Sequence, residues 1–296
     1  MNVYLFIEAE QAERHSVKRA CELLEVSRAA FYQRAAGPSR RDVADEELFE
    51  SIKEAHAESG GTYGSPRVHR ALRDGGQCCG RKRVARIMRN KGLVGRCPKR
   101  WRTTTEQDPD AMTTAVDLIC REFGPGVEID RRWCGDITYV WTWEGWMYLA
   151  TVIDIASRRV VGWALADHLR AELVCDALRD AVTRRQPAAG VIFHSDRGCQ
   201  YTSKEFQDLA ADLDVTLSLG RTGQCWDNAL SESWFSAYKN ELIHTRSWPT
   251  KTSVRRATFE YIESWYNLRR LHSSLGYRSP AAYEATLNQD SAAAAA

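Results

Sequence analysis

The chain has 296 residues, which is more than one average domain, so two or three units with cores of their own are expected. The formal net charge is only +2, but residues 1–104 carry 21 Lys and Arg against 13 Asp and Glu, whereas the remaining residues carry 20 against 26. A basic first third joined to a more acidic remainder predicts a nucleic-acid-binding part attached to a part that holds cations.

The cysteines and the apolar residues exclude several classes of protein. The nine cysteines are scattered and form no CxxC pair, which argues against a disulfide framework and against a Cys/His zinc module. No long apolar run and no export leader is visible, so we expect a cytoplasmic protein with no membrane partner.

Residues 13–36 have the pattern of a helix-turn-helix within a first predicted unit, residues 1–40. Apolar residues recur at helical spacing from Val17 to Leu24, a break follows, and Ser27 is placed to cap a second short helix. In a helix-turn-helix, Arg28 and Tyr32 would lie on the exposed part of that second helix and contact DNA. A helical hairpin without a DNA role fits the residues equally well.

A second helical, helix-turn-helix-like unit is predicted over residues 41–104. Helices are expected at 45–59, 66–73 and 81–91. Between residues 81 and 105 there are ten Lys or Arg and no acid, and unopposed cations favour phosphate binding over a solvated charged face. The candidate DNA contacts on the last helix are Arg81, Lys82, Arg83, Arg86 and Arg89.

A polar linker, residues 105–130 with one short helix at 111–123, leads to an α/β core predicted over residues 131–247. Three strands at 132–141, 147–154 and 159–165 are expected to form an antiparallel meander, followed by a helix at 170–185, a strand at 191–194, a helix capped by Thr202, a strand at 216–219 and a helix from Ala229. This order is that of ribonuclease H, with a five-stranded mixed sheet flanked by helices. A helical extension over residues 248–290 follows, and the terminal alanines are expected to fray.

Three acids of the core are candidates for chemistry. Asp136 lies inside an aromatic and β-branched strand, where a carboxylate is costly unless it is paired or bound to metal. Asp196 falls at the carboxyl end of a short apolar strand, where open α/β sheets keep their ligands. Glu232 lies on the first turn of the helix from Ala229, and Lys239, seven residues later, returns to nearly the same angular position.

The spacing of these acids is that of a known pattern. Fifty-nine residues separate Asp136 from Asp196 and thirty-five separate Asp196 from Glu232, which resembles the D,D(35)E pattern of integrases and insertion-sequence transposases. The segments WCGDITYV, YLATVIDIASRRVVGWA, HSDRGCQYTS, WDNALSESWF with KNE, and YNLRRLHSSLGYRSPAAY follow the same order as in the second-frame transposases of the insertion-sequence-3 family. The chain resembles that family over roughly residues 15–285.

The resemblance implies a DNA transposase that nicks at the ends of its element and transfers the 3′-hydroxyl to another phosphodiester. It implies that Asp136, Asp196 and Glu232 are catalytic and hold two Mg²⁺ ions, with Mn²⁺ as an alternative and Asp136 as the bridging ligand. It also implies that Lys239 contacts terminal DNA, that the first helix-turn-helix contacts DNA, and that the protein acts in a bacterial-type cytosol. The expected partners are double-stranded DNA at the element ends and target, further copies of the chain in a homo-oligomer on DNA, and an upstream-frame protein that is fused to it or paired with it.

Two other functions stay open on the residues alone. The first is a DNA-binding regulator on a catalytically silent nuclease-like core, which the loss of an acid would favour, although none is lost. The second is a simple ribonuclease H-type nuclease, which the basic amino-terminal arm argues against.

Several neighbouring polar residues are expected to be structural. Asp154 is expected to cap the turn at Ser157 rather than to bind metal, and Asp227 to cap the helix that carries Glu232. His194, beside a strand end, is interpreted as structural rather than as a proton carrier. The role of the closing motif, residues 266–283, is not evident from its residues, and packing against the Glu232 helix is as well supported as DNA contact.

Overall fold

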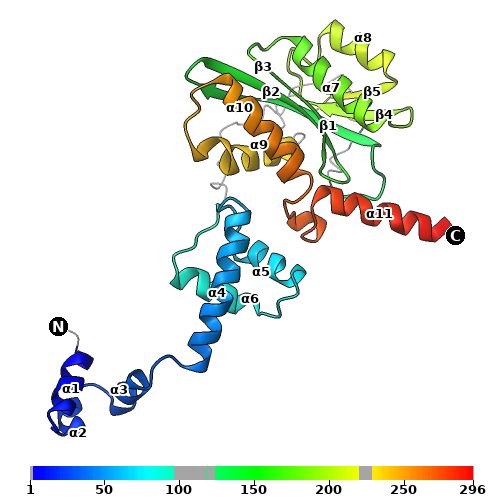
Figure 1. Cartoon of the computed structure of the whole chain (residues 1–296). Coiled ribbons are helices and arrows are strands. Elements are labelled where there is room, and N and C mark those ends of the chain that lie inside the picture. The colour runs from blue at the N-terminus through cyan, green and yellow to red at the C-terminus, as the bar shows by residue number, and fades with distance from the viewer. Residues whose placement is uncertain (1–2, 97–117, 119–123, 220–228, 296) are drawn as a thin grey trace, which may run out of the picture.

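The fold is taken from a computed structural model, which describes residues 3–96, 118, 124–219 and 229–295 (Figure 1). The predicted helix at 111–123, apart from Leu118, lies outside the described residues. The loop before Glu232, including the predicted cap Asp227, also lies outside them.

Three short helices form the amino-terminal unit: α1 (Val3–Ala12), α2 (Val17–Leu23) and α3 (Arg28–Ala35). They pack around a small core of Ile7, Cys21 and Phe31. The helix-turn-helix pattern predicted α2 and α3 but not α1, whose first residues are a continuous apolar run rather than a stripe at helical spacing.

The second unit contains α4 (Arg40–Glu58), α5 (Ser65–Asp74) and α6 (Arg81–Asn90). Helix α4 begins five residues earlier than predicted, because Ser39 and Asp42 form a capping box at its first turn. The three helices enclose one apolar cluster, whose buried members are Ile52, Tyr63, Val68, Leu72, Val84, Ile87 and Met88.

The core is a five-stranded mixed sheet, as predicted, and its strands lie in the order β3-β2-β1-β4-β5. Strands β1 (Arg132–Thr142), β2 (Gly145–Asp154) and β3 (Val160–Ala166) are antiparallel. Strands β4 (Val191–Ser195) and β5 (Val215–Leu219) run parallel to β1 on its other side. Because β4 is much shorter than β1 and pairs with its first residues, the carboxyl end of β4 lies beside the middle of β1.

Helices cover both faces of this sheet (Figure 1). Helices α7 (Ala171–Arg185) and α8 (Lys204–Asp212) close over one face, with Trp133, Val152 and Phe193 among the buried residues below them. The predicted cap of α8 was wrong by one residue: Ser203 rather than Thr202 accepts a hydrogen bond from the backbone of Phe206. Helices α9 (Ala229–Glu241) and α10 (Lys251–Phe259) close over the other face, against Cys134, Leu149 and Ile153 among others.

The carboxyl-terminal part is more ordered than the sequence indicated. The predicted helix at 252–267 is divided into α10 and a π-helical turn, η3 (Glu260–Tyr266), while short 3₁₀ turns form η2 (Ile243–Thr245) and η4 (Ser273–Leu275). Helix α11 (Pro280–Ala295) continues through the alanines that were expected to fray. Across the described ranges, no helix combines the length and apolar content needed to cross a bilayer.

Side chains of the closing motif fasten it to the sheet. The Asn267 amide accepts from the backbone N–H of Val160 at 3.0 Å and donates to its carbonyl at 2.9 Å, as a strand partner would. Arg185 of α7 binds Glu284 of α11 and also Asp130 before β1. The packing against the Glu232 helix that was considered for residues 266–283 is also present: the Tyr266 ring meets the Trp234 ring of α9 edge to face, and Arg270 binds Glu241 of α9.

Candidate active site

Asp136 and Asp196 lie at matching positions of two neighbouring strands. Strands β1 and β4 are parallel, with Cys134 aligned with His194, so two residues later Asp136, in the middle of β1, is level with Asp196, the first residue after β4. The phenol of Tyr201 lies close to both carboxylates: burial raises its pKa well above the usual value, and the negative charges of Asp136 and Asp196 raise it further. The structure thus brings two of the three predicted acids together.

Local backbone contacts hold both carboxylates. Asp136 Oδ1 accepts from the backbone N–H of Ile137 at 2.7 Å, and Asp196 Oδ1 accepts from that of Gly198 at 3.0 Å. Asp136 is half-buried and Asp196 is exposed, so both can reach a ligand from solvent. The pair depends on Gly135, because a Cβ at that position would lie 2.2 Å from the Phe193 ring and would force β1 and β4 apart.

Glu232 is not part of this cluster. It is exposed on the first turn of α9, and the pKa of its carboxyl is raised by partial burial alone, with no contribution from the charges of Asp136 or Asp196. The preceding residue, Ser231, is buried, and its hydroxyl lies 3.4 Å from the Sγ atom of Cys134 on β1. Over residues 3–96, 118, 124–219 and 229–295, no three acid, His or Cys side chains are arranged to hold one metal ion.

Lys239 connects α9 to the carboxylate pair. Its Nζ atom lies 4.8 Å from the centre of the Tyr139 ring. Burial lowers the pKa of Lys239, and the nearby charge of Asp136 partly offsets that effect. The cation predicted to share a helix face with Glu232 therefore lies near Asp136.

Two polar residues beside the site have the structural roles predicted for them. Asp154 accepts from the backbone N–H and the hydroxyl of Ser157, both at 2.7 Å, and from the backbone N–H of Asp130. Burial raises the pKa of Asp154 to about 6, although these hydrogen bonds oppose the change. His194 is buried, and its Nδ1 atom lies 2.9 Å from the Ser218 hydroxyl.

The predicted DNA-binding residues of the amino-terminal units divide into two groups. Arg28, Tyr32, Arg81, Lys82 and Arg89 have exposed side chains, on α3 and α6. Their role in DNA binding stays a prediction.

Arg83 and Arg86, in contrast, both bind the carboxylate of Asp45 on α4. Lys91 is likewise paired with Glu46. The basic run has no acid of its own, but a helix some forty residues earlier in the chain supplies the opposing charges. For Arg83 and Arg86 the expectation of unopposed cations was wrong.

Two arginines that were not among the predicted site residues lie beside α9. Arg67 of α5 and Arg158 of the β2–β3 turn line a cavity against that helix, together with Arg270 and His272 of the closing motif. Arg67 lies outside the quoted family segments, and Arg158 lies within one of them, but only the fold shows that the two line the same cavity.

Comparisons with known proteins follow the same division of the chain. The integrase core domain family matches residues 126–225, a second integrase core domain family matches 213–280, and an HTH-like domain family matches 43–101. The chain is 36% identical over 287 residues to the transposase InsF for insertion sequence IS3A of Escherichia coli (strain K12), covering 95% of this chain and 98% of the relative. It is 35% identical over 247 residues to the transposase for insertion sequence element IS904 of Lactococcus lactis subsp. lactis (strain IL1403), covering 83% and 97%.

Solved structures with partial similarity include retroviral proteins. A simian T-cell lymphotropic virus intasome in complex with PP2A regulatory subunit B56 gamma aligns with a TM-score of 0.46 at 13% identity, over 79% of this chain and 74% of that chain. The HTLV-2 integrase catalytic core domain in complex with magnesium aligns with a TM-score of 0.41 at 16% identity, over 54% and 99%.

Proposed function

This chain belongs to the IS3 family of insertion-sequence transposases, and from that premise we propose that it cuts and joins DNA at a metal site formed by Asp136, Asp196 and Glu232. The observation that carries the proposal is that Asp136, in the middle of β1, is level with Asp196, just after β4, and that the charges of both act on Tyr201.

The side chains of Asp136 and Asp196 fit a divalent cation. Two carboxylates offer hard oxygen ligands, which Mg²⁺ and Mn²⁺ prefer, and Mg²⁺ needs few protein ligands because water and phosphate oxygens complete its shell. Two negative charges held level on neighbouring strands repel each other, so a bound cation would also stabilise the folded site. In the proposed site Asp136, Asp196 and Glu232 would together hold the two ions.

Two divalent ions, when bound, would activate the attacking oxygen and stabilise the leaving one. In cleavage, the oxygen of a water molecule forms a new bond to phosphorus and the bond to the 3′-oxygen at the element end breaks. In joining, the oxygen of that 3′-hydroxyl forms a bond to the phosphorus of a target phosphodiester, and the bond from that phosphorus to the target's own 3′-oxygen breaks. Neither step forms a covalent bond to the protein, since the attacking groups are water and the DNA 3′-hydroxyl.

Glu232 and Lys239 supply the α9 side of the site. Glu232 would complete the ligand set from the first turn of α9. Ser231 of the same turn contacts Cys134 of β1. Lys239, beside Asp136, contacts the DNA backbone that crosses the two acids. The exposed cations Arg28, Arg81, Lys82 and Arg89, with Tyr32, contact DNA away from the reacting phosphate, in a complex that contains more than one copy of the chain and the upstream-frame protein.

The test is a cleavage and joining assay. The chain, alone and fused to its upstream-frame protein, is incubated with labelled duplex carrying the ends of its element and Mg²⁺ or Mn²⁺. Nicks at the ends and joined products are expected, lost in Asp136→Asn and kept in Asp208→Asn, whose exposed acid lies on α8 across the sheet. Binding without metal-dependent products in the fused protein would favour the silent regulator instead, and cleavage confined to RNA–DNA hybrids would favour a ribonuclease H-type nuclease.

A further inference from the structure

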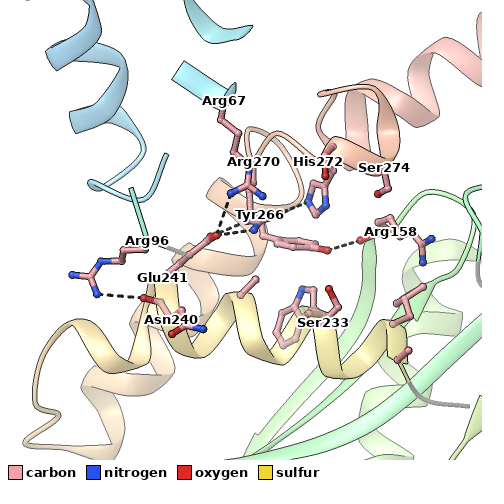
Figure 2. Close-up of a pocket in the computed structure, with 15 residues that line it drawn as sticks. Arg67, Arg96, Arg158, Ser233, Asn240, Glu241, Tyr266, Arg270, His272 and Ser274 are labelled. Carbon is pink, nitrogen blue, oxygen red and sulfur yellow. Dashed lines mark hydrogen bonds and ion pairs between the residues drawn. The ribbon is translucent and has the colours of Figure 1, made fainter. Parts of the chain in front are cut away.

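A cavity of about 450 Å³ lies between the HTH-like domain and the core (Figure 2). Helix α9 forms one wall, with Ser233, Trp234 and Asn240, and the closing motif forms the other. Four arginines line it, namely Arg67, Arg96, Arg158 and Arg270. They come from α5, from the residues after α6, from the β2–β3 turn and from the closing motif, so segments distant in the sequence converge on one space.

The cavity carries an excess of positive charge. The residues that line it include four arginines and one acid, Glu241, which Arg270 binds and which lies 3.9 Å from Arg67. His272 adds no charge: burial lowers its pKa well below the usual value, and the charges of Arg270, Arg67 and Arg158 lower it further. A concave surface with surplus fixed positive charge attracts an anion.

One of the arginines and the carboxylate form the scaffold of the cavity. Arg270 binds both oxygens of Glu241, at 2.8 and 2.6 Å, and the Tyr261 hydroxyl donates to the same carboxylate at 3.0 Å. Both partners of this ion pair are buried, so they are fixed in place. Tyr266 donates to the backbone carbonyl of Arg158 at 3.0 Å, which fixes the turn from which the Arg158 side chain extends.

The rim of the cavity is polar and reachable. Arg96, Ser233, Ser273 and Ser274 are exposed, whereas the floor residues Trp234 and Tyr266 are buried. Arginine donates paired N–H groups in a fork that matches the oxygens of a phosphate, and serine hydroxyls add further donors. The chemistry of the lining therefore fits a phosphate group.

The cavity adjoins the proposed catalytic acid. Ser233 on its rim follows Glu232 directly in α9, so the cavity opens beside the part of that helix that carries Glu232. We propose that the cavity binds one backbone phosphate of the DNA substrate, with Arg67 and Arg158 as its charged ligands. This inference rests on the function proposed above, because it places DNA along α9.

Such a phosphate would join the two domains. Arg67 belongs to the HTH-like domain, which already docks on the closing motif through Tyr63: the Tyr63 hydroxyl accepts from the backbone N–H of Leu271 at 2.8 Å, and its ring packs against Trp265. A phosphate held by Arg67 and Arg158 together fixes the register between DNA bound by the HTH-like domain and DNA at the acids.

The test measures binding alone, in EDTA, so that it does not depend on the metal site. Affinities are determined by fluorescence anisotropy for a duplex carrying one element end and for a series of duplexes in which one phosphate at a time near that end is an uncharged methylphosphonate. The wild type is compared with Arg67→Gln and Arg158→Gln. The control for general charge is Arg179→Gln, on α7 across the sheet, and the control for docking is Tyr63→Phe.

The proposal predicts one position in the duplex whose methylphosphonate weakens binding by the wild type roughly tenfold. Arg67→Gln and Arg158→Gln bind the unmodified duplex roughly tenfold more weakly, with a salt slope smaller by about 0.9, and show no further loss at that position. Arg179→Gln and Tyr63→Phe keep the positional sensitivity, and melting curves verify that each variant is folded.

The proposal is overturned when Arg67→Gln and Arg158→Gln bind as the wild type does, or when they stay as sensitive as the wild type at every position. A wild type that cleaves element ends while these variants bind normally would refute the cavity and leave the proposed function intact. A wild type that shows the positional effect but never cleaves, even when fused to its upstream-frame protein, would support phosphate binding in the cavity and refute the proposed cleavage function.

Discussion

The buried ion pair between Glu241 and Arg270 gives a sharp test of how the closing motif is held. Their side chains are only 5% and 7% exposed, and Arg270 contacts both carboxylate oxygens. Although burial works to lower it, the hydrogen bonds and charge of Glu241 raise the pKa of the Arg270 guanidinium, so it stays charged. We predict that Glu241→Gln destabilises the core strongly.

The magnitude follows from the contacts. A glutamine has one carbonyl oxygen. In the place of Oε2 that oxygen still accepts from Arg270 Nε and the Tyr261 hydroxyl, but the amide group then points its own N–H donors at Arg270 Nη2, which donates to Oε1 in the wild type. Removing one partner of a buried ion pair leaves an uncompensated charge, at a cost of about 3–5 kcal/mol. For a unit of this size that lowers the melting temperature by roughly 10 °C.

The matched control is Glu260→Gln. Glu260 binds Arg256 at 2.9 Å on the surface of the same region, but these side chains are 57% and 82% exposed. An exposed pair of this kind contributes about 0–1 kcal/mol. Thermal and urea unfolding of both variants are followed by tryptophan fluorescence, and equal losses of stability in the two would refute the reasoning from burial.

Three further predictions concern the pH dependence of stability, the hydrogen bonds of Asn267 to β3, and the arginines of α6. Burial raises the pKa of Asp154 to about 6 from 3.8, so the folded state binds this proton more tightly than the unfolded state. This proton stabilises the folded state fully below pH 4, and the stabilisation is lost as the pH rises to 6. In the wild type the unfolding free energy therefore falls by about 3 kcal/mol over this range, and in Asp154→Asn this fall is absent, as urea titration at each pH would measure. Asn267→Ala leaves a buried N–H and a buried carbonyl of β3 unpaired and costs about 2–5 kcal/mol in the same titration. Arg81→Gln weakens DNA binding without changing the melting temperature, whereas Arg83→Gln lowers the melting temperature because it removes a partner of Asp45.

Each of these has a contradicting result. If the unfolding free energies of the wild type and Asp154→Asn changed with pH in parallel, the raised pKa of Asp154 would be contradicted. If Asn267→Ala lost less than 1 kcal/mol of unfolding free energy, the stabilising role of the Asn267 hydrogen bonds to β3 would be contradicted. Indistinguishable melting and DNA-binding changes in Arg81→Gln and Arg83→Gln would contradict the division of the basic helix into exposed and paired cations.

The parts of the fold that the sequence predicted are those set by local pattern. Strand alternation, apolar runs and turns predicted the five strands and their order along the chain, whereas the pairing of β1 with β4 that brings Asp136 level with Asp196 is seen in the structure. Helix α1 was missed, since its apolar residues do not form a stripe.

The parts that could not be predicted depend on contacts distant in the sequence. Asp45 neutralises Arg83 and Arg86 from another helix, and the convergence of Arg67 and Arg158 requires the docking of two domains. A one-dimensional spacing also carries no distance: the thirty-five residues between Asp196 and Glu232 fit the pattern, yet the structure keeps Glu232 out of the pair.

The most direct measurement of the central claim is a metal-specificity switch at Asp136. Asp136→Cys replaces a hard oxygen ligand by a softer sulfur, which Mn²⁺ and Cd²⁺ accept more readily than Mg²⁺ does. If Asp136 holds a catalytic ion, end cleavage by Asp136→Cys is lost in Mg²⁺ and partly restored in Mn²⁺ or Cd²⁺, while Asp208→Cys cleaves in Mg²⁺ as the wild type does. Full activity of Asp136→Cys in Mg²⁺, or no restoration by either softer ion in a folded variant that still binds DNA, would contradict the claim.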